Sequence, residues 1–269
     1  KKQLMILNSP TLNIIYKACI KAAKPLMRDF GEIENLQVSK KGPGDFVTNA
    51  DKRTEKIIMD VLTESKPDVS FITEESGMIE NSSQKKFWVI DPIDGTTNFL
   101  KGIPHFAISI AYMENNEIKS GIVFDPIKNE MFVAEKGLGS FLNNKRIRVS
   151  KQKILKDAII VTGGPNFSSK IKNKTFEEYV EFSKKLDSPI RKLGCAALDV
   201  AYIACGRLDG FWHNELNLWD VGAGAIILKE AGGYIEYIHD KPTDVFKRKV
   251  LASNYLIHED MKKHLNLNL

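Results

Sequence analysis

The stretch Trp-Val-Ile-Asp-Pro-Ile-Asp-Gly-Thr-Thr-Asn-Phe, residues 88–99, combines a strand, a turn and a helix start. Its apolar beginning predicts a buried strand that delivers Asp91 at its end, where Pro92 stops the hydrogen-bond ladder. Asp94 follows three residues later, so a turn can aim both carboxylates at one point. Residues 95–97 then offer consecutive backbone N–H groups and two hydroxyls at a predicted helix start. This arrangement is typical of an anion cradle beside a cation site.

Two other segments also gather acidic residues. Residues 44–51 read Gly-Asp-Phe-Val-Thr-Asn-Ala-Asp and place carboxylates around a hydroxyl at the start of a predicted helix. The apolar run 71–73 ends in the pair Glu74-Glu75. A lone D-x-x-D motif usually only caps a turn, but like charges that crowd together resist burial unless cations neutralise them. Taken together, the three segments favour a cation site over turn capping.

The first part of the chain predicts two helices and then a sheet. Ser9-Pro10 indicates an N-cap and a first helical residue, and apolar residues recur at helical spacing until Gly31. A second helical pattern follows Asn49 and ends before Pro67. Short β-rich runs come next and predict a meandering antiparallel sheet. These runs are 69–73, 87–90, 106–112, 118–124, 131–134 and 140–142.

From about Ile147 the pattern alternates between strands and helices. Strands are predicted at 158–161, 210–212 and 234–237, and helices at 176–186, 196–204 and 221–231. We therefore expect an N-terminal half, residues 1–146, with most of the acidic motifs, and a C-terminal half, residues 147–269. No proline-rich linker separates them, so we expect one compact unit with the site between the halves.

Composition excludes several classes of protein. Among 269 residues, 43% are hydrophobic and 27% charged, which are ordinary values for a globular chain. No apolar run approaches the ~20 residues of a membrane span, so we expect a cytoplasmic protein that does not contact a membrane. The net charge of +5 comes from scattered lysines, which favours a solvated surface over a nucleic-acid site. The three cysteines form no CxxC pair, and a disulfide framework is not expected.

The chain resembles the inositol monophosphatase family in motifs that follow one another in the same order along nearly its whole length. They are 45–51 (Asp-Phe-Val-Thr-Asn-Ala-Asp), 74–76 (Glu-Glu-Ser), 91–99 (Asp-Pro-Ile-Asp-Gly-Thr-Thr-Asn-Phe), 219–225 (Trp-Asp-Val-Gly-Ala-Gly-Ala) and 230–233 (Glu-Ala-Gly-Gly). The resemblance implies an α+β fold, a layered α-β-α-β-α sandwich of the type shared with fructose-1,6-bisphosphatases. It also implies a lithium-sensitive, Mg²⁺-dependent phosphatase of small phosphorylated polyols, usually a homodimer and here of bacterial type.

The resemblance further implies a set of metal ligands. Metal would be held by the side chains of Glu74, Asp91, Asp94 and Asp220 and by the carbonyl oxygen of Ile93. Hard oxygen ligands without a His or Cys cluster suit Mg²⁺, and two to three ions are expected in each active site. Without the resemblance, Asp220 would be interpreted as a helix cap, since it precedes the helix predicted at 221–231.

Catalytic and phosphate-binding roles are carried over in the same way. Thr96, paired with Asp45, would orient the attacking water, while metal and Glu74 lower the pKa of that water. Gly95, Thr96 and Thr97 would donate hydrogen bonds to the phosphate oxygens, and only glycine at position 95 permits a close backbone approach.

Substrate contacts are implied after a strand expected at 190–193. Gly194, Cys195 and Ala196 occupy the region that contacts the polyol, and their small side chains leave room for a ring. Cys195 is not favoured as a nucleophile, because no base flanks it. His213 stands where the family commonly has an acidic residue, and Glu215 follows two residues later. This departure concerns the substrate and leaves the chemistry unchanged.

Two alternatives stay open. One is a broader sugar or nucleotide phosphatase acting on fructose bisphosphate, histidinol phosphate or NADP-type substrates. The other is a binding role for RNA or a polymerase on the same fold, although the intact ligand positions favour an enzyme.

Overall fold

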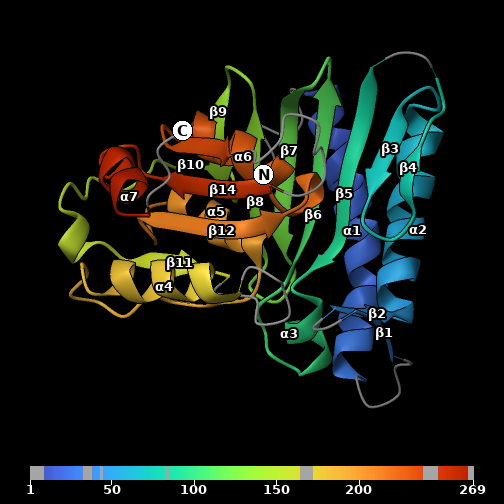
Figure 1. Ribbon diagram of the computed structural model, residues 1–269. Coiled ribbons are helices and arrows are strands. Elements are labelled where there is room, and N and C mark those ends of the chain that lie inside the picture. Colours follow the sequence, from blue (N-terminus) through green and yellow to red (C-terminus); the bar gives the residue numbers. More distant parts are fainter. Residues whose placement is uncertain are drawn as a thin grey trace.

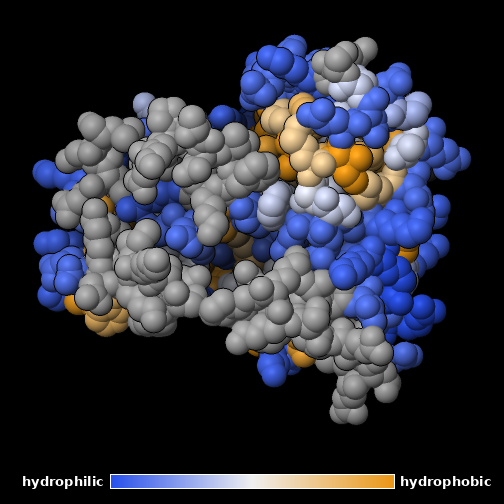
Figure 2. Space-filling model, turned by 45° about the vertical axis from the view of Figure 1, so that its right-hand side comes forward, coloured by the Kyte–Doolittle hydropathy of each residue, from blue (hydrophilic) through white to orange (hydrophobic). Residues whose placement is uncertain are grey.

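The computed structural model describes residues 9–32, 38–42, 45–82, 85–163, 172–238 and 248–265. Figure 1 shows the helices and sheets stacked in layers, with α1 and α2 along one side. Among the helices within these ranges, none combines the length and apolar character that a membrane span needs. On the face shown in Figure 2, most coloured residues are hydrophilic, and apolar residues gather most clearly in the upper part of the view.

Two helices form the first layer. In α1 (Pro10–Gly31), Ser9 caps the start by accepting a hydrogen bond from the backbone N–H of Leu12 at 3.1 Å. The second helix, α2 (Asn49–Ser65), packs against α1. Both predicted helices are confirmed, including their ends before residues 32 and 67. A two-stranded hairpin of β1 (Val38–Gly42) and β2 (Asp45–Thr48) lies between them in the sequence.

An eight-stranded sheet forms the second layer, in the order β10-β9-β8-β7-β6-β5-β3-β4. Its strands are β3 (Ser70–Thr73), β4 (Gly77–Ile79), β5 (Lys86–Asp94), β6 (Ala107–Glu114), β7 (Glu117–Asp125), β8 (Glu130–Glu135), β9 (Gly139–Leu142) and β10 (Lys145–Arg146). Side chains alternate between the two faces. Ile90 packs with the α1 and α2 residues, whereas Val89 packs in the cluster that contains α5 and α6.

The expected antiparallel meander is wrong at one place. Strands β3 and β5 are parallel, with Ser70 opposite Phe87 and Thr73 opposite Ile90. The reason is that β4 turns back along the outer side of β3, so the chain must return past β3 before it enters β5. This exception positions the candidate site, because the carboxyl ends of both strands meet at one edge of the sheet.

The remaining layers come from the later part of the chain. Helices α5 (Ala196–Ala204) and α6 (Leu218–Glu230) lie between the eight-stranded sheet and a four-stranded sheet of order β11-β12-β14-β13. The strands of the latter are β11 (Ile160–Thr162), β12 (Gly210–Leu216), β13 (Tyr234–Ile238) and β14 (Arg248–Ser253). Helices α4 (Lys172–Ser183) and α7 (His258–His264) cover its outer side through Phe182 and Met261.

The order of layers is therefore α-β-α-β-α, as the resemblance implied. Several details differ from the prediction. Helix α7 and the strands β1, β2, β4, β10 and β14 were not predicted, and the strand expected at 190–193 is only a single bridge between Val161 and Arg191. The division at residue 146 stays a prediction, although the eight-stranded sheet ends at Arg146.

Candidate active site

Strand β5 carries Asp91 and Asp94 to the edge of the sheet. Regular pairing with β6 reaches Asp91 opposite Ser109 and then shifts before Asp94. The Asp91 side chain bends back over the turn, and its Oδ1 accepts a hydrogen bond from the backbone N–H of Ile93 at 3.1 Å. This is a local turn of the kind that aspartate stabilises. In a regular strand, side chains three residues apart point to opposite faces of the sheet. The extra residue of this bulge puts Asp91 and Asp94 on the same face, opposite Ser109 and Ala107.

Gly95 makes the turn from β5 into the short helix α3 (Thr96–Leu100). Its φ is +95°, a left-handed value that glycine adopts without a steric penalty. A Cβ at this position would lie 3.1 Å from the carbonyl oxygen of His105 and 3.2 Å from that of Gly194. Position 95 therefore requires glycine for its conformation and for the close approach of two other backbone segments.

The parallel pairing of β3 with β5 brings Glu74 to the same edge. Glu74 follows the last residue of β3, and its backbone N–H donates to the carbonyl oxygen of Ile90 at 3.2 Å. Glu74 consequently lies beside the residue that precedes Asp91.

Asp220 arrives from the opposite layer, in the first turn of α6. Its Oδ2 accepts a hydrogen bond from the backbone N–H of Asn217 at 2.6 Å, within a capping box that begins at Asn217. The Ser109 hydroxyl lies 3.3 Å from the carbonyl oxygen of Trp219 and ties this turn to β6. Asp220 does cap the helix, three positions later than a simple N-cap, and it also faces the sheet.

The charges of these carboxylates act on one another. Burial raises the pKa of Asp91 well above its usual range, and the nearby charges of Glu74, Asp94 and Asp220 raise it further. Burial also raises the pKa of Asp94 to about 6, opposed by hydrogen bonds to that carboxylate. The charges of Glu74, Asp94 and Asp220, which act on Asp91, are all negative.

Such a group of carboxylates fits hard divalent cations. The donors are oxygens alone, which suits Mg²⁺ better than zinc. Within the described ranges, no three His, Cys, Asp or Glu side chains are close enough to hold one ion as they stand. Backbone N–H groups orient the three aspartates. That of Ile93 donates to Oδ1 of Asp91, that of Ala197 to Oδ2 of Asp94 and that of Asn217 to Oδ2 of Asp220.

Thr96 begins α3 beside this group. Its hydroxyl donates to the carbonyl oxygen of Ile93 at 3.0 Å and lies 3.4 Å from Oδ1 of Asp51. The Asp51 side chain is buried in the first turn of α2 and was quoted in the sequence motif, but without a role. The predicted partner, Asp45, lies in β2, and its side chain falls outside the described part of the structure. Thr97 is exposed at the same helix start.

Sequence reasoning missed Glu55, which supports the loop after Glu74. Its Oε1 accepts a 2.5 Å hydrogen bond from the Ser76 hydroxyl, and its Oε2 accepts one from the backbone N–H of Glu75 at 3.0 Å. The Glu55 side chain is buried, and burial raises its pKa. A single polar residue on a helix gives no signal of such a contact in the sequence.

The segment 194–196 adjoins Asp94. The Cys195 thiol donates to Oδ2 of Asp94 at 3.0 Å, and the backbone N–H of Ala197 donates to the same oxygen at 2.5 Å. Burial raises the pKa of Cys195 well above its usual value, and the charge of Asp94 adds to this effect. A thiol held in its neutral form is a poor nucleophile. Gly194 is exposed, whereas Ala196 is partly buried.

His213 and Glu215 lie on β12. The backbone N–H of Glu215 donates to Nδ1 of His213 at 3.1 Å. Burial lowers the pKa of His213 to about 4, and the charge of Lys192 acts in the same direction. The imidazole is therefore neutral at pH 7, with its proton on Nε2. Its ring faces Gly163, where an added Cβ would overlap Nε2.

The chain is similar to known proteins along most of its length. The model of the inositol monophosphatase family matches residues 7–268. An inositol-1-monophosphatase of Rhizobium meliloti is 46% identical over 226 residues, which are 84% of this chain and 85% of that protein. The Nus factor SuhB of Escherichia coli K12 is 42% identical over 84% of each chain. A crystal structure of the extragenic suppressor protein suhB from Bartonella henselae is 40% identical, with a TM-score of 0.89 over 97% of this chain and all of that one.

Proposed function

Since the chain belongs to the inositol monophosphatase family and is a phosphomonoesterase, we propose that it hydrolyses myo-inositol monophosphates or similar small polyol phosphates with Mg²⁺. The observation that carries the proposal is the convergence of Glu74, Asp94 and Asp220 on the buried Asp91. Four carboxylates gathered in one place repel one another, which is unfavourable unless cations are present.

We propose that the carboxylates of Glu74, Asp91, Asp94 and Asp220 hold two to three Mg²⁺ ions, with the carbonyl oxygen of Ile93 as a further ligand. When bound, Mg²⁺ supplies a water of lowered pKa and stabilises the charge that develops on the leaving oxygen. The protein's own part is to orient the carboxylates, and for the three aspartates it does so through the backbone hydrogen bonds described above.

Thr96 has a separate role in this proposal. Its proton is engaged by the carbonyl of Ile93, so its oxygen lone pairs are free to accept a hydrogen bond from the attacking water. Glu74 would receive the proton of that water. The backbone N–H groups at residues 95–97, at the start of α3, would bind the phosphate oxygens and orient the ester.

Substrate choice is tested by a phosphate-release screen with Mg²⁺ over inositol 1-phosphate, glycerol 2-phosphate, fructose 1,6-bisphosphate, histidinol phosphate and NADP. The proposal requires the highest kcat/KM among the polyol monophosphates and inhibition by LiCl. A clear preference for a bisphosphate or a nucleotide would support the broader phosphatase instead. We also expect the protein to be cytoplasmic and to form a homodimer. Sedimentation of the purified protein tests the dimer.

A second candidate function is docking of RNA or of a polymerase on the same fold. The 42% identity to the Nus factor SuhB of Escherichia coli K12 favours testing it. An RNA mobility shift that weakens steeply with salt, in a variant without phosphatase activity, would support this role.

A further inference from the structure

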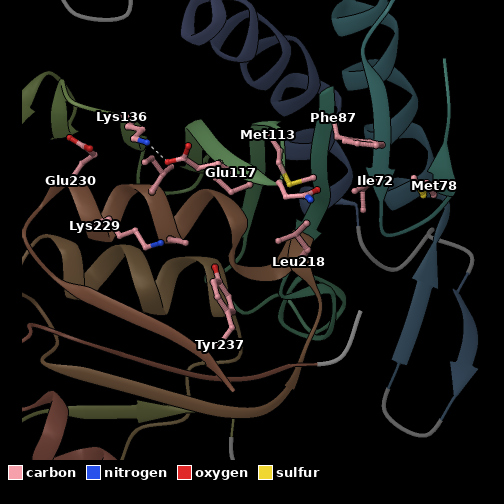
Figure 3. Close-up of a pocket in the computed structure, with 14 residues that line it drawn as sticks. Ile72, Met78, Phe87, Met113, Glu117, Lys136, Leu218, Lys229, Glu230 and Tyr237 are labelled. Atoms are coloured by element: carbon pink, nitrogen blue, oxygen red, sulfur yellow. Dashed lines mark hydrogen bonds and ion pairs between the residues drawn. The ribbon is translucent and has the colours of Figure 1, made fainter. Parts of the chain in front are cut away.

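A pocket of about 650 Å³ opens between the eight-stranded sheet and α6, apart from the four candidate metal ligands. Its walls come from β3, β5 and β6 on one side and from α6 and β13 on the other. Figure 3 shows its lining residues. A volume of this size accommodates a small organic ligand.

The two ends of the pocket differ in character. In Figure 3, Glu117, Lys136, Lys229 and Glu230 lie toward one end, and Ile72, Met78, Phe87 and Met113 lie toward the other. An amphipathic molecule matches such a pocket better than a uniformly apolar one, because each of its parts meets groups of its own polarity.

The charged residues at the polar end determine which head group the ligand can have. Glu117 is neutralised by Lys119 and Lys136. Glu230 accepts hydrogen bonds from the backbone N–H groups of Gly137 and Gly139 at 2.8 Å each. The Lys229 ammonium has neither an ion pair nor a hydrogen bond to any residue in the described ranges. The Lys229 ammonium is therefore available to pair with an anion at this end.

The apolar end selects the body of the ligand. Met78 is 49% exposed, and Met113 joins it from β6. Methionine side chains are flexible and adapt to irregular apolar shapes. A flexible alkyl chain is therefore a better match here than a rigid ring.

We propose that this pocket binds a small amphipathic anion, an unbranched acyl chain with a single carboxylate that faces Lys229. The inference goes beyond the proposed phosphatase function and does not depend on it. The pocket nevertheless shares structural elements with the candidate active site. Ile72 precedes Glu74 by two residues, and Leu218 precedes Asp220 by two.

The test is calorimetric titration of the full chain with decanoate below its micellar concentration, without substrate or metal. We expect saturable binding of one decanoate per chain. Removal of two methylenes in octanoate should weaken binding about fifteenfold, because each buried methylene contributes about fourfold in Kd. Decyltrimethylammonium, with the opposite head charge, should bind more weakly than decanoate.

Two lysine variants separate the pocket from the general surface charge. Lys229→Gln should weaken decanoate binding about three- to fivefold, the range expected of an exposed ion pair. Lys151→Gln removes an exposed lysine that does not line the pocket and should leave Kd unchanged. Ala225→Leu, which fills the pocket from α6, should abolish binding while circular dichroism shows a folded protein.

Three results would overturn the proposal. They are the absence of saturable binding, equal Kd values in the two lysine variants, and equal affinity for both head charges. If decanoate instead dissociates a dimer in sedimentation, with Ala225→Leu doing the same, the pocket is covered by a second copy of the chain and the acyl site is rejected.

Discussion

The backbone N–H of Ala197 donates a 2.5 Å hydrogen bond to Oδ2 of Asp94, and so joins the start of α5 to the end of β5. The same oxygen accepts the thiol of Cys195 at 3.0 Å. Two groups from a distant part of the chain therefore fix one oxygen of Asp94. The position of this carboxylate depends on the packing of both halves.

Asp91→Asn and Asp94→Asn should each lower kcat by at least about a thousandfold, because each removes charge from the proposed metal cluster. The measurement is phosphate release from inositol 1-phosphate over a range of Mg²⁺ concentrations. Asp60→Asn, a change at an exposed carboxylate on α2, is the matched control and should have no effect. Full turnover of the parent protein in EDTA would contradict the metal requirement.

Gly95→Ala should lower the free energy of unfolding by about 1–3 kcal/mol and reduce kcat strongly. The added Cβ would press on the carbonyl oxygens of His105 and Gly194 and disturb the start of α3. Gly77→Ala is the control, since Gly77 also has a positive φ but nothing within 4 Å of an added Cβ. Urea unfolding of the two variants separates backbone strain from the steric clash. Equal losses would show that the close approach at Gly95 has no importance.

Thr96→Ala should mainly lower kcat and leave the apparent affinity for Mg²⁺ nearly unchanged, because the hydroxyl is proposed to orient water. Thr96→Ser keeps the hydroxyl that donates to Ile93 and should retain most of the activity. Activity measured against Mg²⁺ concentration distinguishes the two parameters. A large loss of Mg²⁺ affinity with unchanged kcat would reverse the assignment.

Most of the fold followed from local patterns in the sequence. The Ser9 cap of α1 and the periodicity of α1 and α2 are strong local signals, and so is the apolar run that ends at Asp91. The parallel pairing of β3 with β5 was missed because strand direction depends on where β4 packs, which no local pattern reports.

The candidate site shows the same limit. Its acidic motifs are visible in the sequence, but their convergence depends on the β5 bulge and on α6. Asp51 and Glu55 were given no role because their contacts join α2 to loops 20 to 45 residues away. The contact of Cys195 with Asp94 spans 101 residues and has no sequence signal of its own.

Stability should depend on pH through His213. Its pKa is lowered from 6.5 to about 4 in the folded protein, so below pH 6.5 the unfolded chain binds a proton that the folded chain does not. The contribution of the neutral His213 to the free energy of unfolding is therefore fully present above pH 6.5 and is lost as the pH falls toward 4. Since the side chain is partly exposed, we expect a loss of about 1–2 kcal/mol.

Urea unfolding at pH 7.5 and pH 5.0 measures this dependence. His213→Gln should show a smaller loss between these pH values than the parent. Between pH 7.5 and 8.5 the two proteins should change alike, which is the internal control. Identical losses at low pH would assign the effect to other groups.

Selectivity for the inositol ring should also depend on His213. Its Nδ1 accepts a hydrogen bond from the backbone N–H of Glu215. The other nitrogen of the neutral ring, Nε2, is a donor, and it faces Gly163. A carboxylate at this position can accept hydrogen bonds from two ring hydroxyls, whereas this imidazole accepts none from the substrate. His213→Glu should therefore lower KM for inositol 1-phosphate by about 5- to 30-fold, or about 1–2 kcal/mol. The value of kcat should change little, because the residue would contact the ring and not the phosphorus.

Glycerol 2-phosphate is the control substrate, since it has no ring, and Glu215→Ala is the control variant. Our assignment requires that His213→Glu shifts the ratio of kcat/KM values toward inositol 1-phosphate and that Glu215→Ala leaves it nearly constant. Glu215 lies on β12 two residues after His213 and is partly exposed. Its carboxylate can therefore turn toward a bound ring in place of His213. If Glu215→Ala collapses the ratio while His213→Glu does not move it, Glu215 is the ring contact. The role of His213 would then be limited to packing against Gly163.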